Sequence, residues 1–203
     1  MLIGDPIWSL AKKEAIRFTG NDKFYFFDRN VGVGDAITVA FAMTPEHRAN
    51  TLPIARVPKT GDAGWAVQLT EHGQIIFRVG SSARHQAVIV DANYPADKET
   101  HVACVFDKGT ARVYVNGELK KTESGIPFTV KDATAAGRLG AVNNLYEAVG
   151  DVIVHNEDAD VASARSFKKY HNFVGELRDV RIHNRALSDK EIAAMNVPFA
   201  KRE

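Results

Sequence analysis

The sequence predicts an all-β protein, an antiparallel β-sandwich of the jelly-roll type with one short helix near the C-terminus. Short segments in which apolar and polar residues alternate recur along the chain, and turns containing Gly and Asn separate them. Many short strands joined in this way are typical of a sandwich or jelly roll. The helix is predicted to start near Ser188, where a capping signal follows the last strand pattern.

The expected strands are recognised by their side-chain patterns. The segment 101–106 is apolar on both faces, as in a central strand that is covered on both sides. Asn116-Gly117 predicts a type I′ hairpin turn after the segment 110–115, because both residues tolerate positive φ. Further strands are expected at 15–18, 23–27, 36–42, 65–69, 74–79 and 85–90. Alternation gives the core side chains Ile37, Val39, Phe41, Trp65, Val67 and Leu69.

The predicted helix has clear start and stop signals. Ser188 is a favourable N-cap, and Glu191 stands three residues later, which completes a capping box. Leu187 and Ile192 occupy the hydrophobic staple positions, and Pro198 lies past the expected end. A helix of one to two turns is not stable alone, so it must pack on the sandwich.

The bulk properties restrict the function classes. The chain has 203 residues, of which 45% are hydrophobic, and this suits one domain over 1–203. The net charge is +1 and no long block of like charge occurs, so we expect no nucleic-acid partner. No run of about 20 apolar residues occurs, so we expect no membrane insertion. The single cysteine, Cys104, excludes an intramolecular disulfide and is expected to be a buried core thiol.

Four blocks of the sequence, in order, resemble the laminin-G-like family of the concanavalin-A-like lectin and glucanase superfamily. The segment 173–195 resembles the closing pattern F-x-G-x-(L/I)-D-(D/E)-V-R-I-(Y/H)-N-R-A-L-S-x-x-E-I. The segment 101–121 resembles the hairpin H-V-A-x-V-x-D-x-G-x-x-x-x-Y-V-N-G-x-L. The segments 15–20 and 137–140 resemble the opening A-L-x-F-D-G and the strand L-R-I-G. The resemblance covers 15–195 and implies a single jelly-roll domain; because such folds carry lectins, enzymes and docking domains, function must be inferred from sites.

No catalytic constellation is found in the sequence. Jelly-roll glucanases carry acids of the type E-x-D-x-x-E on one strand, and no strand here has them. Glu176 and Asp179 are three residues apart, so on a regular strand they lie on opposite faces. The seven histidines are scattered without metal-ligand spacing. We therefore expect no enzyme activity, and a glycan-active hydrolase or lyase stays as an alternative.

We expect no cofactor and no metal. The segment 156–160 matches the first three ligand positions of an EF-hand loop, but Val161 and Phe167 stand where Gly and Glu are required. The resemblance implies a structural calcium between the first and last strands. Lys23 and Arg178 stand where the family often has acids, and two cations beside calcium would repel it. An ion pair of Asp22 with Arg178 is expected to tether the chain ends instead.

The candidate ligand contacts follow from what sugar sites in such folds use, namely exposed aromatic rings with amide or charged groups nearby. The loop residues Asn143, Asn144 and Tyr146 are the predicted glycan contacts. Tyr94, in an Asn-Tyr-Pro turn, and Trp8 are further candidates. For each of these residues a packing or turn role is favoured over a ligand contact.

These observations favour a non-enzymatic recognition module that acts at a surface and binds protein or glycan. The alternative is a structural protein that decorates a bacteriophage virion; either kind is expected to self-associate or bind a large partner through a sheet face or edge. Asp5 and Pro6 interrupt the apolar N-terminal stretch, so it does not resemble a signal peptide. A virion, or another surface reached without the usual export signal, is expected if Met1 is native, and an extracellular location if the chain is an excised module.

Overall fold

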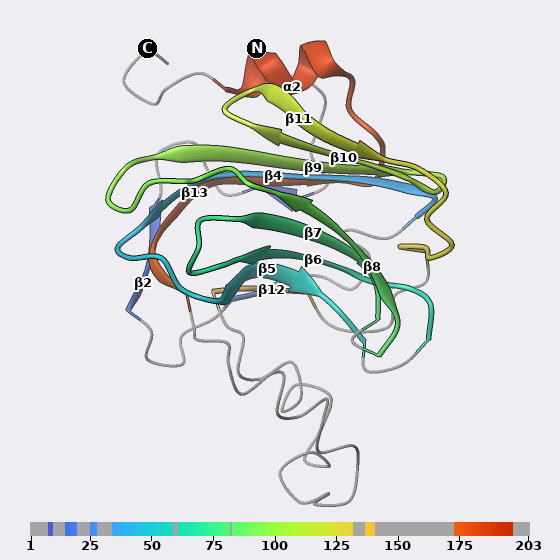
Figure 1. Cartoon of the computed structure of the whole chain (residues 1–203), viewed down its shortest axis with the longest axis horizontal. Helices are drawn as coiled ribbons and strands as arrows, with labels where there is room; N and C mark the ends of the chain where they lie inside the picture. The colour runs from blue at the N-terminus through green and yellow to red at the C-terminus, as the bar shows by residue number, and fades with distance from the viewer. Residues whose placement is uncertain are drawn as a thin grey trace, which may run out of the picture.

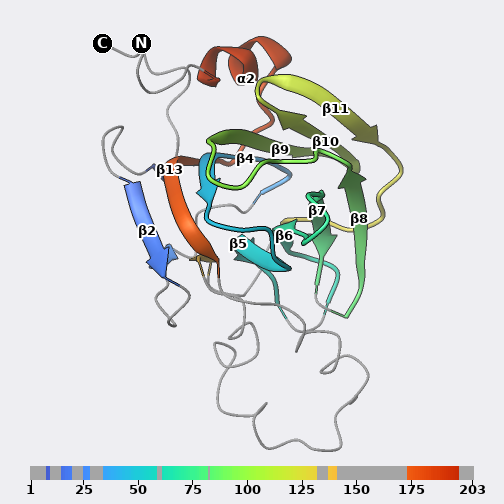
Figure 2. The ribbon, with the colours of Figure 1, turned by 60° about the vertical axis from the view of Figure 1, so that its left-hand side comes forward.

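The computed structural model describes residues 8–9, 15–19, 25–27, 34–58, 61–81, 83–131, 137–140 and 173–196. Two β-sheets face each other, and one helix lies outside them (Figures 1 and 2). The first sheet contains β1 (Trp8–Ser9), β2 (Ala15–Thr19), β4 (Ala36–Pro45), β9 (Thr100–Asp107), β10 (Thr110–Val115), β11 (Glu118–Glu123) and β13 (Val174–His183). The second contains β3 (Tyr25–Phe27), β5 (Thr51–Arg56), β6 (Trp65–Leu69), β7 (Ile75–Gly80), β8 (His85–Val90) and β12 (Gly137–Leu139).

The strand order confirms the predicted antiparallel sandwich. The first sheet has the order β1-β13-β4-β9-β10-β11, and β2 also pairs with β13. The second has the order β3-β12-β5-β6-β7-β8. All of these pairings are antiparallel. The opening strand β2 and the closing strand β13 are therefore neighbours, although they are far apart in sequence.

The main core lies between the two sheets and is filled from both. The side chains predicted from alternation in β4 and β6 are all buried there, and so is the thiol of Cys104 in β9. β9 is buried on both faces over 100–106, as its pattern predicts. Asn116 and Gly117 have φ values of 51° and 80°, which confirms the turn between β10 and β11.

Helix α2 (Asp189–Met195) packs on the outer face of the first sheet, over β4, β9 and β10 (Figure 1). The capping box of Ser188 and Glu191 is present as predicted. Leu187 and Ile192 are fully buried against a separate cluster on the sheet, which contains Ala40, Ala103, Val105 and Tyr114. No helix in the described part of the chain is long and apolar enough to cross a membrane.

Candidate ligand-binding site

A polar pocket lies on the outer face of the first sheet, beside the area that α2 covers. Arg17 of β2 pairs in register with Glu176 of β13, and Glu176 pairs with Thr44 of β4. These three side chains therefore form one row across three adjacent strands (Figure 2 shows β2 beside β13). Phe18, Met43 and Leu177, the next residues along each strand, are core residues, so the row faces outward. The pocket, called the Arg17 pocket below, is lined by Arg17, Thr44, Glu46, Asp97, Gly175 and Glu176.

The backbone around the pocket explains why these residues come together. The N–H of Glu46 donates to the carbonyl of Val174 at 3.1 Å, and the N–H of Asp97 donates to the carbonyl of Pro45 at 2.8 Å. Gly175 has a φ of 137°, and a Cβ on it would lie 2.3 Å from the carbonyl oxygen of Thr44. Only glycine permits this close approach of β13 and β4.

Arg17 lies between two of the carboxylates. Its guanidinium forms an ion pair with Glu46 and stands 3.7 Å from Glu176 (Nη1 to Oε1). Arg178 donates to the second oxygen of Glu176 at 2.7 Å. Asp97 is exposed, and no ion pair of its carboxylate occurs within the described residues. The pocket thus offers both hydrogen-bond donors and carboxylate acceptors to a ligand.

The size of the pocket suits a small organic group. Its volume is about 420 Å³, which is within the range of small-molecule sites. The side chain of Arg17 is 61% exposed and that of Glu46 is 41% exposed, so a ligand can reach both from solvent. No aromatic side chain is among the described lining residues. Recognition would therefore depend on hydrogen bonds and charge.

A β-bulge in β13 separates the pocket from the neighbouring Asp179. Arg178 pairs with Ala42 and Arg181 with Ala40, so β13 has one extra residue at this point. Leu177 and Val180 consequently both enter the core. The expectation that Glu176 and Asp179 alternate across a regular strand is therefore wrong here. Asp179 accepts two hydrogen bonds from the outward-facing Arg181, at 2.7 and 2.8 Å, and both side chains are buried.

The described residues do not fit the calcium site that the resemblance implies. Arg178 places its guanidinium on Glu176, where a cation would need a free carboxylate. Within the described residues, no group of three or more His, Cys, Asp or Glu side chains is arranged to hold a metal ion. Asp22 and Lys23 lie outside the described residues, so the expected pair of Asp22 with Arg178 stays a prediction.

Most of the ligand contacts predicted from sequence lie outside the described residues. This holds for Asn143, Asn144 and Tyr146 and for the side chain of Trp8. The segment 156–160, whose match to a calcium loop was rejected from sequence, also lies outside the described residues. Tyr94 is described, and of its two possible roles the structure supports packing. Its side chain is buried, its hydroxyl donates to the carbonyl of Thr70 at 2.7 Å, and Arg48 stacks on its ring.

The sequence analysis did not single out the pocket residues, although one signal was present. The opening and closing blocks of the resemblance contain Arg17 and Glu176, and those blocks were expected to be adjacent. Aligning the two blocks in antiparallel register would have paired these residues, as observed. Glu46 and Asp97 carry no such signal, because irregular backbone contacts bring them to the pocket.

The comparisons with known proteins agree with the observed architecture. A family model described as concanavalin A-like lectin/glucanases superfamily matches residues 18–153, which is more than half of the chain. The CBM40 of the Ruminococcus gnavus IT-sialidase, bound to α2,3-sialyllactose, superposes with a TM-score of 0.67 at 16% identity. That match covers 95% of this chain and 100% of the other. No curated protein sequence matches the chain.

Two further solved structures are similar. The native heptameric SAP-like pentraxin of Limulus polyphemus has a TM-score of 0.64 at 17% identity, covering 90% of this chain and 81% of the other. Domain 4 of the extracellular GH43 arabinanase AbnA from Geobacillus stearothermophilus, in complex with arabinotriose, has a TM-score of 0.59 at 16% identity. It covers 91% of this chain and 87% of the other. At these identities the similarity establishes the sandwich fold alone.

Proposed function

Because the chain belongs to the concanavalin A-like lectin/glucanases superfamily, we propose that it is a non-enzymatic recognition module that binds a glycan in the Arg17 pocket. The observation that carries this proposal is the outward-facing row of Arg17, Glu176 and Thr44, which Glu46 and Asp97 extend into a pocket. Two of the similar structures, the CBM40 and the arabinanase domain, hold oligosaccharides, and they support a glycan as the kind of ligand.

The chemistry of the pocket suits a sugar. Sugar hydroxyls donate and accept hydrogen bonds, so they need both kinds of partner on the protein. Glu46, Asp97 and Glu176 supply acceptors, whereas the guanidinium of Arg17 and the hydroxyl of Thr44 supply donors. Several of these groups are charged, which strengthens each hydrogen bond to a hydroxyl.

Geometry argues against catalysis in the same pocket. Retaining and inverting glycosidases place the scissile bond between two carboxyl groups. Here the guanidinium of Arg17 contacts both Glu46 and Glu176 and fills the space between them. A glycosidic bond cannot occupy that position while Arg17 is there. A screen of β-glucans, alginate and glycosaminoglycans should therefore show no turnover; turnover that a single Glu or Asp substitution abolished would contradict this.

A glycan array followed by calorimetry on the best ligand tests the proposal. Arg17→Gln removes the donor that links Glu46 and Glu176, and we expect it to weaken binding by about tenfold or more. Arg84→Gln is the matched control, because Arg84 is similarly exposed and paired with Asp62, but it lies outside the pocket. If the protein bound no glycan on the array, or if Arg17→Gln and the parent bound the best ligand with equal affinity, binding in this pocket would be refuted.

The residues Asn143, Asn144 and Tyr146 are proposed as a second set of glycan contacts. Their types support this role, since an aromatic ring can stack on a sugar and amides can bond its hydroxyls. Tyr146→Ala should weaken binding of the glycan found on the array without lowering the melting temperature. A loss of stability with unchanged affinity would assign Tyr146 to packing.

Docking on a protein surface, including decoration of a bacteriophage virion, is the alternative proposal. β11 ends the first sheet, and its exposed side chains include Glu118, Lys120 and Lys121. Charges on an edge strand oppose pairing with a second chain, so such docking would use a sheet face. Sedimentation showing a monomer that still binds an oligosaccharide would favour the lectin-like role, and a defined oligomer without glycan binding would favour docking.

A further inference from the structure

We propose that the Arg17 pocket selects a glycan unit that carries a protonated amine and discriminates against sialic acid and other carboxylated sugars. This inference depends on the proposed glycan-binding function and specifies its ligand class. The charge of the pocket lining supports it. Three carboxylates, those of Glu46, Asp97 and Glu176, face one guanidinium, that of Arg17. The lining residues that the structure describes therefore carry an excess of negative charge, which remains when Arg178 beside Glu176 is added.

Three arginines at or near the pocket are already engaged within the described part of the chain. Arg17 is shared between Glu46 and Glu176, and Arg178 donates to Glu176. Arg48, which follows the end of β4, donates to the carbonyl of Tyr94 at 2.8 Å and to the side chain of Asn93 at 2.7 Å. An anionic sugar that bound one of these three arginines would have to displace one of these contacts.

The carboxylates, in contrast, keep capacity for a ligand. An ionised carboxylate offers about four acceptor positions. Glu46 is 41% exposed and its partner within the described residues is Arg17. Asp97 is exposed and has no ion pair within the described residues, so its carboxylate can receive an ammonium without displacing another group. The position of Asp97 is set by its backbone bond to Pro45, which keeps the carboxylate on the lining.

A preference for a sugar that carries a protonated amine would come from the pocket and not from the charge of the whole protein. The chain has a net charge of +1, so it does not attract polycations in general. One additional charge contact at close range changes affinity by about tenfold near a protein surface, and salt weakens it. The preference should therefore be strong at low salt and small at high salt.

Matched ligand pairs test the inference by calorimetry at low salt and mildly acidic pH. A glucosamine tetrasaccharide is compared with its N-acetylated form, which has the same sugar backbone without the amine charge. Lactose is compared with α2,3-sialyllactose, and tetralysine serves as an amine probe without a sugar ring. We expect the amine form to bind about tenfold more tightly than the acetylated form, and sialyllactose to bind no more tightly than lactose.

A charge-neutral variant identifies the group responsible. Asp97→Asn should weaken binding of the amine form severalfold more than binding of the acetylated form, because only the amine form loses an opposite charge. Glu118→Gln on β11 is the control, since Glu118 is 73% exposed and lies outside the pocket. If Asp97→Asn and Glu118→Gln reduced the preference for the amine form equally, the preference would depend on the overall charge of the protein and not on the pocket. The inference would then be wrong.

The possible failures are distinguishable. If the acetylated form binds as tightly as the amine form, or sialyllactose binds more tightly than lactose, the charge inference is wrong and glycan binding survives. If tetralysine binds as tightly as the amine tetrasaccharide, the pocket recognises the amine charge and not the sugar ring. The proposed ligand class is then wrong. If none of the saccharides binds and the array also retains none, the proposed function fails as well.

Discussion

Tyr94 is a single residue for which the sequence leaves two roles, packing and sugar contact. Its Asn-Tyr-Pro context predicts a turn, and an aromatic ring in a turn is a reasonable sugar platform. In the structure the ring is packed inward and its hydroxyl bonds the carbonyl of Thr70. Arg48 covers the ring from outside, with its guanidinium carbon 5.6 Å from the ring centre. The long-range partner Thr70, which the sequence does not indicate, decides the role.

Tyr94→Phe tests this assignment through stability. The variant loses the hydrogen bond to Thr70, while the carbonyl of Thr70 keeps a bond from the N–H of Gly73. The free energy of unfolding at neutral pH should therefore fall by about 1 kcal/mol, measured by urea denaturation. Glycan affinity should not change, and a loss of affinity at unchanged stability would restore Tyr94 as a ligand contact.

The same variant makes a prediction about alkaline pH. Burial raises the pKa of Tyr94 from 10.0 to about 12, against the smaller opposing effect of the Arg48 guanidinium. Between these values the unfolded state releases its proton first, so the contribution of Tyr94 to stability declines as the pH rises. The stability difference between the parent and Tyr94→Phe should shrink over this range. A constant difference would contradict the burial of the phenol.

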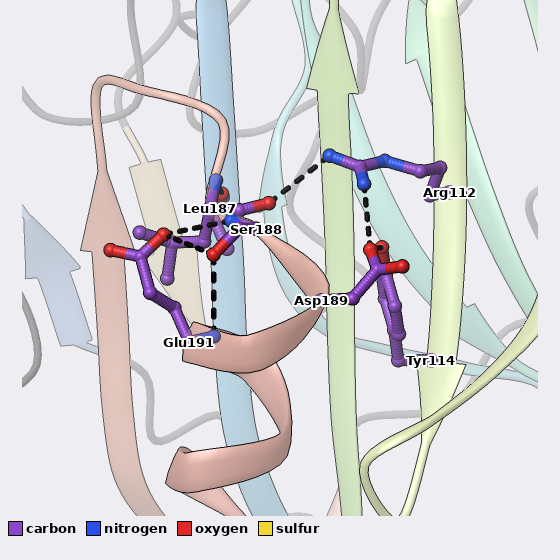
Figure 3. Close-up of polar contacts among 7 residues, drawn as sticks. Arg112, Tyr114, Leu187, Ser188, Asp189 and Glu191 are labelled. Atoms are coloured by element: carbon purple, nitrogen blue, oxygen red, sulfur yellow. Dashed lines mark hydrogen bonds and ion pairs between the residues drawn. The ribbon is translucent and has the colours of Figure 1, made fainter.

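At the scale of elements, α2 begins at the capping box that its sequence predicts. Asp189 accepts hydrogen bonds from the hydroxyl of Tyr114 at 2.7 Å and from Arg112 at 2.9 Å (Figure 3). Arg112 also donates to the carbonyl of Leu187. The capping box begins the helix, and these contacts from β10 fix it on the sheet. The cap was predictable because it is local, and the contacts with β10 were not.

Glu191→Gln tests the energetic role of the cap. Hydrogen bonds from Arg185 and from the backbone N–H of Ser188 lower the pKa of Glu191 from 4.5 to about 2. Because the folded-state pKa is depressed, the stabilisation is present above pH 4.5 and is lost as the pH falls towards 2. The stability difference between parent and variant should shrink over this range. Glu71→Gln, on an exposed turn away from α2, is the control substitution, and a constant difference between the parent and Glu191→Gln would contradict the role of the cap.

Other elements show where sequence patterns stop being informative. The strands β8 and β10 have the predicted bounds, since alternation and turn residues define them. β5 was not predicted, because Pro53 is unfavourable inside a strand. The strand forms because its register shifts between Thr51 and Ile54, and the carbonyl of Pro53 accepts from Gly140. The bulge in β13 was missed for a similar reason, as pairing with β4 and not local composition creates it.

At the scale of the whole molecule, closure of the sandwich depends on the pairing of β2 with β13. Five residue pairs join these strands, and the side chains of Arg17 and Glu176 stand 3.7 Å apart across them. Such an exposed ion pair contributes only about 0–1 kcal/mol. Strand pairing and the packing of Phe18 against Phe173, with ring centres 6.0 Å apart, must contribute most of the closure.

A calcium titration tests this account of closure. Because Arg178 stands where the family often has an acid, and its guanidinium donates to Glu176, we expect the melting temperature to be unaffected by EDTA and by millimolar calcium. A ligand that binds only the folded state must raise its stability. An increase of several degrees with calcium would therefore reveal a metal site formed by ligands that include residues beyond those described.

The fold was predictable from sequence to a much greater extent than the site. Strand patterns and the four blocks are local signals, so they identify the sandwich and its helix. The Arg17 pocket combines residues from β2, β4, β13 and the loop that contains Asp97, and only the three-dimensional register brings them together. The predicted contacts Asn143, Asn144 and Tyr146 were chosen by residue type alone and stay a prediction.

The central claim is that a glycan binds in the Arg17 pocket, and NMR titration tests it most directly. Labelled protein is titrated with the glucosamine tetrasaccharide, and backbone amide shifts are followed. The account predicts shifts concentrated at the amides of residues 17, 44, 46, 97, 175 and 176, with Asp97→Asn reducing their magnitude. The absence of saturable shifts, or shifts confined to other surfaces such as the edge strand β11, would contradict it.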